Sequence, residues 1–301
     1  MRHRPIGWGT GWRSLVLIGL ACHLGTGSAM PNAQSATALR EQYRLLGGQL
    51  QHNAFQRPLV LHSTETQQGL RGDIYALMSF PFEAVSTALK DPDQWCEVMI
   101  LHTNTKYCRA TTTAPGIVLS IRIGAKTPQE LNQAAHVRFN YSVTQSTPEY
   151  FEVVLDAKDG PLGTSDYRIR MEVVALPKGR SFLHLTYSYA VNFAGKLAMQ
   201  SYLATRGADK VGFTVVNKPG DKQPVLIEGV RGLIERNTMR YYLAIDSFLQ
   251  SEKLAPSEQF ENRLQSWFSA VEQYPLQLHE MDRPAYLEMK RAEHLRQQTV
   301  R

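Results

Sequence analysis

An amphipathic stretch in the last third of the chain constrains the fold most: residues 229–249, GVRGLIERNTMRYYLAIDSFL. Its apolar residues recur three and four positions apart, which is the spacing of one buried face of an α-helix. These residues are Val230, Leu233, Ile234, Tyr241, Ala244, Ile245 and Phe248. Asn237 lies within that face with Glu235 and Arg236 beside it, and such groups are costly to bury without partners. The pattern predicts a long helix that covers a core and carries polar side chains into it.

A series of short β-rich segments precedes this helix. Between residues 136 and 144, apolar and polar side chains alternate, as is typical of a half-buried strand. Turns containing Gly or Pro separate the expected strands at residues 70–80, 106–113, 117–123, 136–144, 150–157, 167–176 and 181–191. This spacing predicts an antiparallel meander. We expect further helices at 81–89, 91–101, 194–205, 256–272 and from 283 to the end.

The first 29 residues have the layout of a secretory signal peptide. Three arginines lie among the first thirteen residues, residues 14–24 are almost uninterruptedly apolar, and small residues follow at 27–29. The apolar run is too short to span a bilayer comfortably. We therefore expect a periplasmic or secreted protein that is cleaved near Ala29. In an alternative interpretation Cys22 is lipidated, because Leu20, Ala21 and Cys22 resemble the end of a lipobox.

The charge of the mature chain excludes one class of partner. Removal of residues 1–29 takes away three of the 33 Lys and Arg residues and none of the 27 Asp and Glu residues, so the formal net charge falls from +6 to +3. This charge is small and scattered, whereas nucleic acid requires a clustered basic face. No second apolar run approaches membrane-spanning length. We expect a soluble protein without a nucleic-acid partner or an integral membrane segment.

Two cysteines remain after cleavage, Cys96 and Cys108, with eleven residues between them. In an oxidising compartment such a pair is a disulfide candidate, and closure of the loop would contribute about 3 kcal/mol. The alternative is a pair of separate buried thiols. No CxxC motif includes either cysteine, so a redox-catalytic role is not expected.

No sequence motif indicates a metal, a cofactor or a catalytic nucleophile. The nine histidines are scattered without HxH, HxxxH or HExxH spacing, and GxSxG is absent. We therefore predict no metal, no cofactor and no catalytic residue. His102 and Lys106 either contact an anionic head group at the mouth of a cavity or belong to a solvated loop. His136 and His184 are interpreted as ordinary sheet residues.

The order of elements resembles a known fold family. A first strand, two short helices, about six antiparallel strands and a long C-terminal helix form the helix-grip pattern of the START-domain and polyketide-cyclase (SRPBCC) superfamily. The blocks that carry the resemblance are LRGDIYALMSFPFEAVSTALKDPDQW and the helix at 229–249. The resemblance implies an α+β fold in which a curved antiparallel sheet wraps around the long helix and leaves a cavity. Members mostly bind hydrophobic ligands such as sterols, lipids and polyketides, and some catalyse cyclisation or dehydration.

On this basis we divide the chain into four parts. After the signal peptide, residues 30–67 are expected to form a helical and irregular leader, residues 68–250 the helix-grip domain, and residues 251–301 a C-terminal helical tail. Extra helices would therefore lie at both ends of the domain.

The leading hypothesis is an exported protein that holds a hydrophobic or amphipathic, lipid-like molecule in the cavity. The candidate ligand contacts are Asp73, Tyr75, Tyr187, Tyr189, Glu235, Asn237, Arg240 and Tyr241. The polar helix residues could instead form ion pairs, since Arg231 and Glu235 are four positions apart. Two alternatives are a cyclase or hydratase that uses Glu235 or Asp73 as general acid or base, and a periplasmic module that meets a protein partner through its C-terminal tail.

Overall fold

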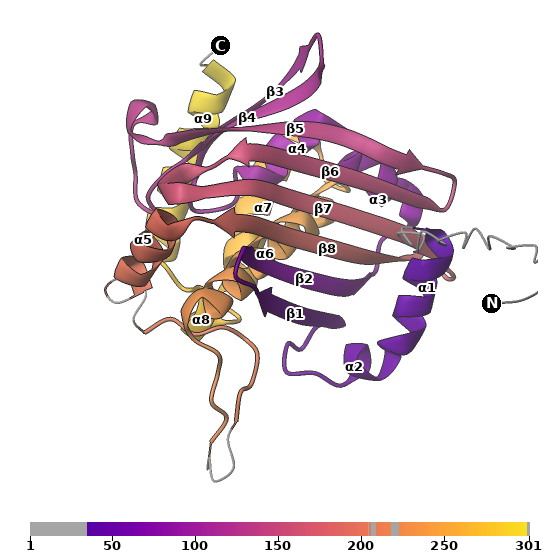
Figure 1. Ribbon diagram of the computed structural model, residues 1–301. Helices are drawn as coiled ribbons and strands as arrows, with labels where there is room; N and C mark the ends of the chain where they lie inside the picture. Colours follow the sequence, from indigo (N-terminus) through magenta and orange to yellow (C-terminus); the bar gives the residue numbers. More distant parts are fainter. Residues whose placement is uncertain (1–34, 204, 206–208, 218–222, 300–301) are drawn as a thin grey trace, which may run out of the picture. The chain divides into compact units, whose positions relative to one another are not determined.

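A curved antiparallel sheet of eight strands is the centre of the computed structural model, which describes residues 35–203, 205, 209–217 and 223–299 (Figure 1). The strands lie in the order β1-β2-β8-β7-β6-β5-β4-β3. β2 pairs with β8, so the first two strands of the chain extend the sheet beyond its last strand. The strands are β1 (Leu59–Glu65), β2 (Gly69–Met78), β3 (Thr105–Thr113), β4 (Gly116–Ile123), β5 (Ala135–Ser146), β6 (Tyr150–Asp159), β7 (Thr164–Leu176) and β8 (Arg180–Val191).

The long helix α6 (Gly229–Ser251) lies across one face of this sheet, with α7 (Pro256–Val271) packed on it (Figure 1). We call the face toward α6 the inner face and the opposite one the outer face. The remaining helices are α1 (Ala36–Leu45), α2 (Gly47–Gln51), α3 (Phe82–Leu89), α4 (Pro92–Met99), α5 (Phe193–Leu203), α8 (Pro275–Leu278) and α9 (Arg283–Thr299), with short 3-10 turns η1 (Leu131–Gln133) and η2 (Pro161–Gly163). The predicted α+β helix-grip fold is confirmed.

Strand alternation decides which side chains enter the core between the sheet and α6. On β2, the even-numbered residues Leu70, Ile74 and Ala76 belong to this core. Gly72 lies in the same row, and a Cβ atom there would come within 2.2 Å of Oγ1 of Thr238 on α6. The close approach of the helix to the sheet therefore depends on a residue without a side chain.

The sheet begins earlier than the expected domain boundary at residue 68. β1 pairs with β2 from Leu59 to Glu65 and buries Leu59 and Leu61 on the inner face. On the outer face Val60 joins a second, smaller core to which α1 and α2 contribute. The sequence of residues 52–66 is polar and gives no clear strand pattern, because β1 is short and has few residues that point into the main core. The leader is thus part of the domain from α1 onward.

Residues 251–299 are likewise an integral part of the fold. Leu264 and Trp267 of α7 and Tyr286 of α9 belong to the main core, and the Trp267 and Tyr286 rings stack with centroids 5.0 Å apart. The sequence suggested a tail because the contact partners of these helices lie far away in the chain.

Buried charges fasten α9 to β3. Glu293 lies 2.8 Å from Nζ of Lys106 and 2.6 Å from Nζ of Lys290, and all three side chains are almost completely inaccessible. His102 is also buried. The expectation of a solvated loop or a cavity mouth at His102 and Lys106 is therefore wrong, because α9 covers these residues.

A disulfide joins Cys96 of α4 to Cys108 of β3, with the Cα atoms 5.2 Å apart. The predicted pairing is present in the structure, and the alternative of two separate thiols is not. The expected signal peptide and Cys22 lie outside the described residues. Within those residues, no helix combines the length and the apolar character needed to cross a bilayer.

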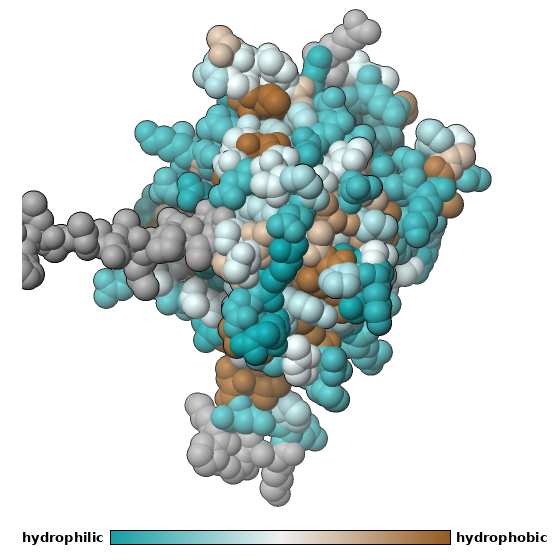
Figure 2. All heavy atoms as spheres, turned by 90° about the vertical axis from the view of Figure 1, so that its right-hand side faces the viewer, coloured by the Kyte–Doolittle hydropathy of each residue, from teal (hydrophilic) through white to brown (hydrophobic). Residues whose placement is uncertain are grey.

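A ribbon between α5 and α6 extends from the body of the protein (Figure 1). It consists of residues 209–217 and 223–228 and contains a bridge between Val215 and Leu226. Val215, Val216 and Val225 are exposed, and Figure 2 shows apolar surface beside the grey segment. The ribbon is thus an apolar surface that is accessible to contact.

Candidate ligand-binding site

A pocket of about 620 Å³ lies at the end of the sheet where the β4–β5 connection, η2 and the segment between α8 and α9 meet. We call it the end pocket. Ile123, Ala135 and Leu162 supply apolar wall, and Lys126 and Glu280 supply charged groups. A concave site of this size with mainly apolar walls and a few polar groups is typical of small-molecule binding.

An aromatic layer of the core is linked to the lining of the end pocket through Asn104. Asn104 lines the pocket, and its backbone N–H donates to Nδ1 of His102 at 3.2 Å. The His102 ring packs on Tyr241 of α6, which in turn packs on Tyr187 of β8, both with centroids 5.1 Å apart. The helix and the sheet therefore meet through aromatic rings at this end of the grip.

The layer continues along the inner face of the sheet. Tyr189 of β8 stacks on Tyr167 of β7 with centroids 5.0 Å apart. Burial raises the pKa of Tyr187, Tyr189 and Tyr241, so these side chains remain neutral phenols near neutral pH. Within the described part of the chain, the hydroxyl groups of these three tyrosines make no hydrogen bond.

Two cations converge on one carboxylate at the wall of the end pocket. Nζ of Lys126 and Nη2 of Arg240 both lie 2.5 Å from Oε1 of Glu280. Burial and the nearby charge of Arg240 lower the pKa of Lys126 to about 8, although Glu280 partly offsets them. Burial alone would raise the pKa of Glu280, but the charges of Arg240 and Lys126 outweigh it and lower that pKa.

Two further cations surround this cluster. Nη1 of Arg236 donates to the backbone carbonyls of Lys210 and Val211 at 3.2 and 3.1 Å. Burial lowers the pKa of Lys210, and although Glu280 raises it, the charges of Lys126, Arg240 and Arg236 lower it further. Arg236 and Lys210 thus act electrostatically on the cluster of Lys126, Arg240 and Glu280.

Several predicted site residues meet at this end of the molecule. Tyr187, Tyr189 and Tyr241 form the aromatic layer, and Arg240 belongs to the charged wall. Asn237 is half-buried on α6, and its Oδ1 lies 3.4 Å from Nη1 of Arg240. Tyr187 and Tyr189 share one face of their strand, Tyr241 belongs to the buried face of the helix, and Asn237 and Arg240 are three positions apart on it. These spacings explain why the structure groups the five residues.

Glu235 has a different role from the expected one. It is completely buried, and its oxygens accept hydrogen bonds from the hydroxyls of Ser63 and Thr214 and from the backbone N–H groups of Phe213 and Thr214, at 2.6 to 3.0 Å. It joins α6 to β1 and to the ribbon. Arg231 also contacts Ser63, so the two helix residues share a partner on β1.

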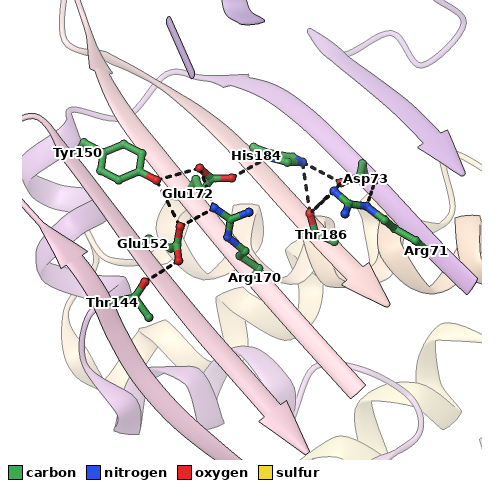
Figure 3. Close-up of polar contacts among 9 residues, drawn as sticks. All are labelled: Arg71, Asp73, Thr144, Tyr150, Glu152, Arg170, Glu172, His184 and Thr186. Carbon is green, nitrogen blue, oxygen red and sulfur yellow. Dashed lines mark hydrogen bonds and ion pairs between the residues drawn. The ribbon is translucent and has the colours of Figure 1, made fainter. Parts of the chain in front are cut away.

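Asp73 and Tyr75 do not reach the inner face. Their odd numbers place them opposite Ile74 on β2, so both lie on the outer face, and the expectation that they line the cavity is wrong. Asp73 receives hydrogen bonds from Arg71, His184 and Thr186 there (Figure 3). Tyr75 stacks on the His184 ring with centroids 4.1 Å apart.

The outer-face polar network is a row of alternating charges across four strands. Both ring nitrogens of His184 face carboxylates, with Nε2 2.8 Å from Asp73 and Nδ1 2.9 Å from Glu172 (Figure 3). Burial opposes ionisation, but the hydrogen bonds to the two carboxylates outweigh it and raise the pKa of His184. The imidazolium form has two N–H donors and therefore satisfies both carboxylates. His184 is thus a buried cation of the network.

The same network determines the state of Asp73. Burial alone would raise the pKa of this carboxyl group, but hydrogen bonds from His184, Arg71 and Thr186 and the charge of Arg71 hold it well below its usual range. A carboxylate held so firmly in the ionised form is a poor general acid or base near neutral pH.

Sequence reasoning missed Lys126 and Glu280. They are 154 residues apart and belong to segments without a recognisable motif. A lone lysine after a strand and a lone glutamate before a helix carry no pattern, so only the folded structure brings them together. Among the described residues, no group of three or more His, Cys, Asp or Glu side chains is arranged to hold a metal ion.

Solved structures with a similar fold have low sequence identity. Norcoclaurine synthase from Thalictrum flavum in complex with dopamine and hydroxybenzaldehyde is 12% identical, with a TM-score of 0.33, and the match covers 50% of this chain and 81% of that chain. A START superfamily protein from Mycobacterium smegmatis is 11% identical over 50% and 92% of the two chains, with a TM-score of 0.30.

Ara h 8.0201 is 8% identical over 64% of this chain and 100% of that chain, with a TM-score of 0.35. The chain has a helix-grip fold. The pairing of its strands and the position of α6 establish this, in agreement with the predicted resemblance, and the likeness to these structures concerns the fold alone. No protein-family model matches the chain, and no curated protein matches it.

Proposed function

We propose that this protein binds a hydrophobic or amphipathic, lipid-like small molecule in the end pocket. The observation that carries this proposal is the pocket of about 620 Å³ with mainly apolar walls and a few polar groups. An apolar part of a ligand gains free energy when it leaves water for such a wall, and a few polar groups would orient it. Fold resemblance contributes the expectation of a hydrophobic ligand but not its identity.

The proposed location differs from the expected cavity between the sheet and α6. Ile234, Met239 and Leu243 fill much of that space and are completely buried in the main core. The ligand would therefore bind in the end pocket, at the end of the sheet, and not along the length of the helix.

The geometry favours binding over the alternative of cyclase or hydratase chemistry. Glu235 uses both of its oxygens to hold β1 and the ribbon, and Asp73 lies on the outer face within an ion-pair network. Neither carboxylate lines the end pocket. The two groups that were considered for general acid–base catalysis are therefore occupied by structural contacts.

Export to the periplasm or the cell exterior is the second part of the proposal. It is supported by the layout of residues 1–29 and by the Cys96–Cys108 disulfide, since disulfides persist in oxidising compartments. N-terminal sequencing of protein recovered from cell fractions tests it. We expect cleavage near Ala29, and an intact N-terminus in the cytoplasm would contradict export. A lipid on Cys22 would support the alternative anchor.

Native mass spectrometry tests the ligand-binding function directly. Freshly purified protein should carry a small molecule that organic extraction releases, or the stripped protein should bind members of a panel of fatty acids, phospholipids and sterols. Protein that is free of ligand as purified and that also ignores the whole panel would overturn the proposal.

A further inference from the structure

We propose that the ligand of the end pocket has two apolar branches, the second of which lies in a neighbouring groove beside α9. This inference rests on the ligand-binding function proposed above and specifies the class of ligand as an amphiphile with two chains on one polar linker, such as a diacyl lipid. A short single-chain ligand would occupy only one of the two pockets.

The groove beside α9 is the first observation. It has a volume of about 330 Å³ and lies between α9 and residues 127–129 of the β4–β5 connection, and we call it the α9 groove. Its apolar wall recurs three or four positions apart and therefore forms one stripe along the helix and the residues just before it. The members of this stripe are Met281, Ala285, Met289 and Ala292. The two alanines keep the groove open because their side chains are short.

The charged groups of the groove leave this stripe to an apolar partner. Glu293 lies between the two buried lysines described above, and Nη1 of Arg296 donates to the backbone carbonyl of Gln129 at 3.1 Å. Glu288 is exposed and borders the groove. An apolar chain gains free energy when it leaves water for a wall of methionine and alanine. The α9 groove thus suits the hydrocarbon part of a ligand.

A shared boundary between the two pockets is the second observation. Thr127 and Gln129 line both of them, and the consecutive residues Glu280 and Met281 line the end pocket and the α9 groove, respectively. Residues 127–129 therefore form a narrow ridge with a pocket on either side. Thr127 is exposed on this ridge, and its hydroxyl is a donor for an ester carbonyl of a linker that crosses it.

Hydrogen bonds on both sides hold the ridge in place. The side chain of Gln129 accepts from the backbone N–H of Ala125 at 2.7 Å and donates to the backbone carbonyl of Gln133 at 3.0 Å. The backbone carbonyl of Gln129 is bound to Arg296 of α9. Both pockets are therefore preformed, and the binding of a two-branched ligand requires little ordering of the protein.

Two probes with the same head group and the same number of acyl carbons separate this inference from the underlying function. Dihexanoylphosphatidylcholine carries these carbons in two chains, and dodecanoyl lysophosphatidylcholine carries them in one. Each is titrated into the full mature protein by calorimetry, below the concentration at which it forms micelles. We expect the two-chain probe to bind at least as tightly as the single-chain probe.

The opposite result follows if only the end pocket binds a chain. The second hexanoyl chain would then stay in water and forfeit the free energy of its burial, so the two-chain probe would bind about tenfold weaker or more. Weaker binding of the two-chain probe would thus overturn the two-branched ligand but leave the ligand-binding function in place. Binding of neither probe, together with a negative lipid panel, would overturn the function itself.

A variant that fills the α9 groove tests the assigned position of the second branch. Ala285→Trp should weaken binding of the two-chain probe about tenfold or more and leave the affinity for the single-chain probe unchanged. Ala84→Trp adds the same ring at an exposed position of α3, which lines neither pocket, and should leave both affinities unchanged. An unchanged affinity of Ala285→Trp for the two-chain probe would overturn the assignment, and so would an equal loss for both probes.

Photo-cross-linking gives a readout that needs no variant. A dihexanoyl probe with a diazirine at the end of each chain should label the peptides that contain Ile123 and Ala135 as well as those that contain Met281 and Met289. Labelling confined to the lining of one pocket would overturn the two-branched ligand.

Discussion

The outer-face network predicts a pH-dependent loss of stability when His184 is replaced. In His184→Gln, two buried carboxylates, Asp73 and Glu172, lose the cation that lies 2.8 and 2.9 Å from them. Breaking a buried ion pair costs several kcal/mol, and the remaining glutamine donor recovers part of it, so we expect a loss of about 3 kcal/mol near pH 6.

The sign of the pH dependence follows from the raised pKa of His184 in the folded state. A group with a raised folded pKa contributes stability that is fully present below its unfolded pKa, about 6.5 for histidine, and that is lost as the pH rises through the folded pKa. Asp73 and Glu172, whose pKa values are lowered, stay ionised in the folded state above about pH 5. The difference between wild type and variant should therefore decrease from about pH 6 toward pH 9.

Urea unfolding curves of both proteins at several pH values measure this difference. His136→Gln is the matched control, because His136 is exposed on the outer side of β5 and makes no ion pair with another described residue, so its replacement should change stability little. A His184→Gln effect that does not change with pH, or that grows toward pH 9, would refute the assignment of His184 as a buried cation.

Three further predictions concern the contacts that hold the domain together. Replacement of Cys96 and Cys108 by serine should reduce the free energy of unfolding by about 3 kcal/mol, measured in urea, and an equal stability of the two proteins would contradict the entropic estimate. Glu293→Gln removes the carboxylate between two buried lysines and should reduce the free energy of unfolding by about 3 kcal/mol. Glu288→Gln, on the exposed side of α9, is its control. Equal losses of stability in the two variants would show that burial is irrelevant. Glu235→Gln should weaken the hydrogen bonds to the ribbon and speed amide exchange there; unchanged exchange would mean that the ribbon is held by other contacts.

Much of the fold could be predicted from local patterns. The strands from β2 to β8 and helix α6 follow alternation and three-to-four spacing closely, because their side chains alternate between a core and solvent or a second core. β1 and the helices after α6 were harder to place. β1 has few inward residues, and α7 to α9 bury their apolar faces against partners that the sequence does not identify.

The candidate site was predictable only in part. Tyr187, Tyr189 and Tyr241 were found because strand and helix periodicity identify the buried faces. Asp73 was assigned to the cavity although it is adjacent to Ile74 on the strand and therefore lies on the opposite face. The two-residue period of a strand thus predicts the face of a side chain better than its chemistry does. Lys126 was missed because ion pairs between distant segments leave no local pattern.

The binding of a lipid-like ligand by an occluded variant tests the central claim most directly. Ala135 lines the end pocket at the start of β5, and Ala135→Phe would place an aromatic ring in it. Ser142→Phe adds the same ring on the exposed outer side of the same strand. In calorimetric titrations with dodecanoate, we predict that Ala135→Phe abolishes binding while Ser142→Phe binds like the wild type. Undiminished binding by a folded Ala135→Phe variant would contradict the account.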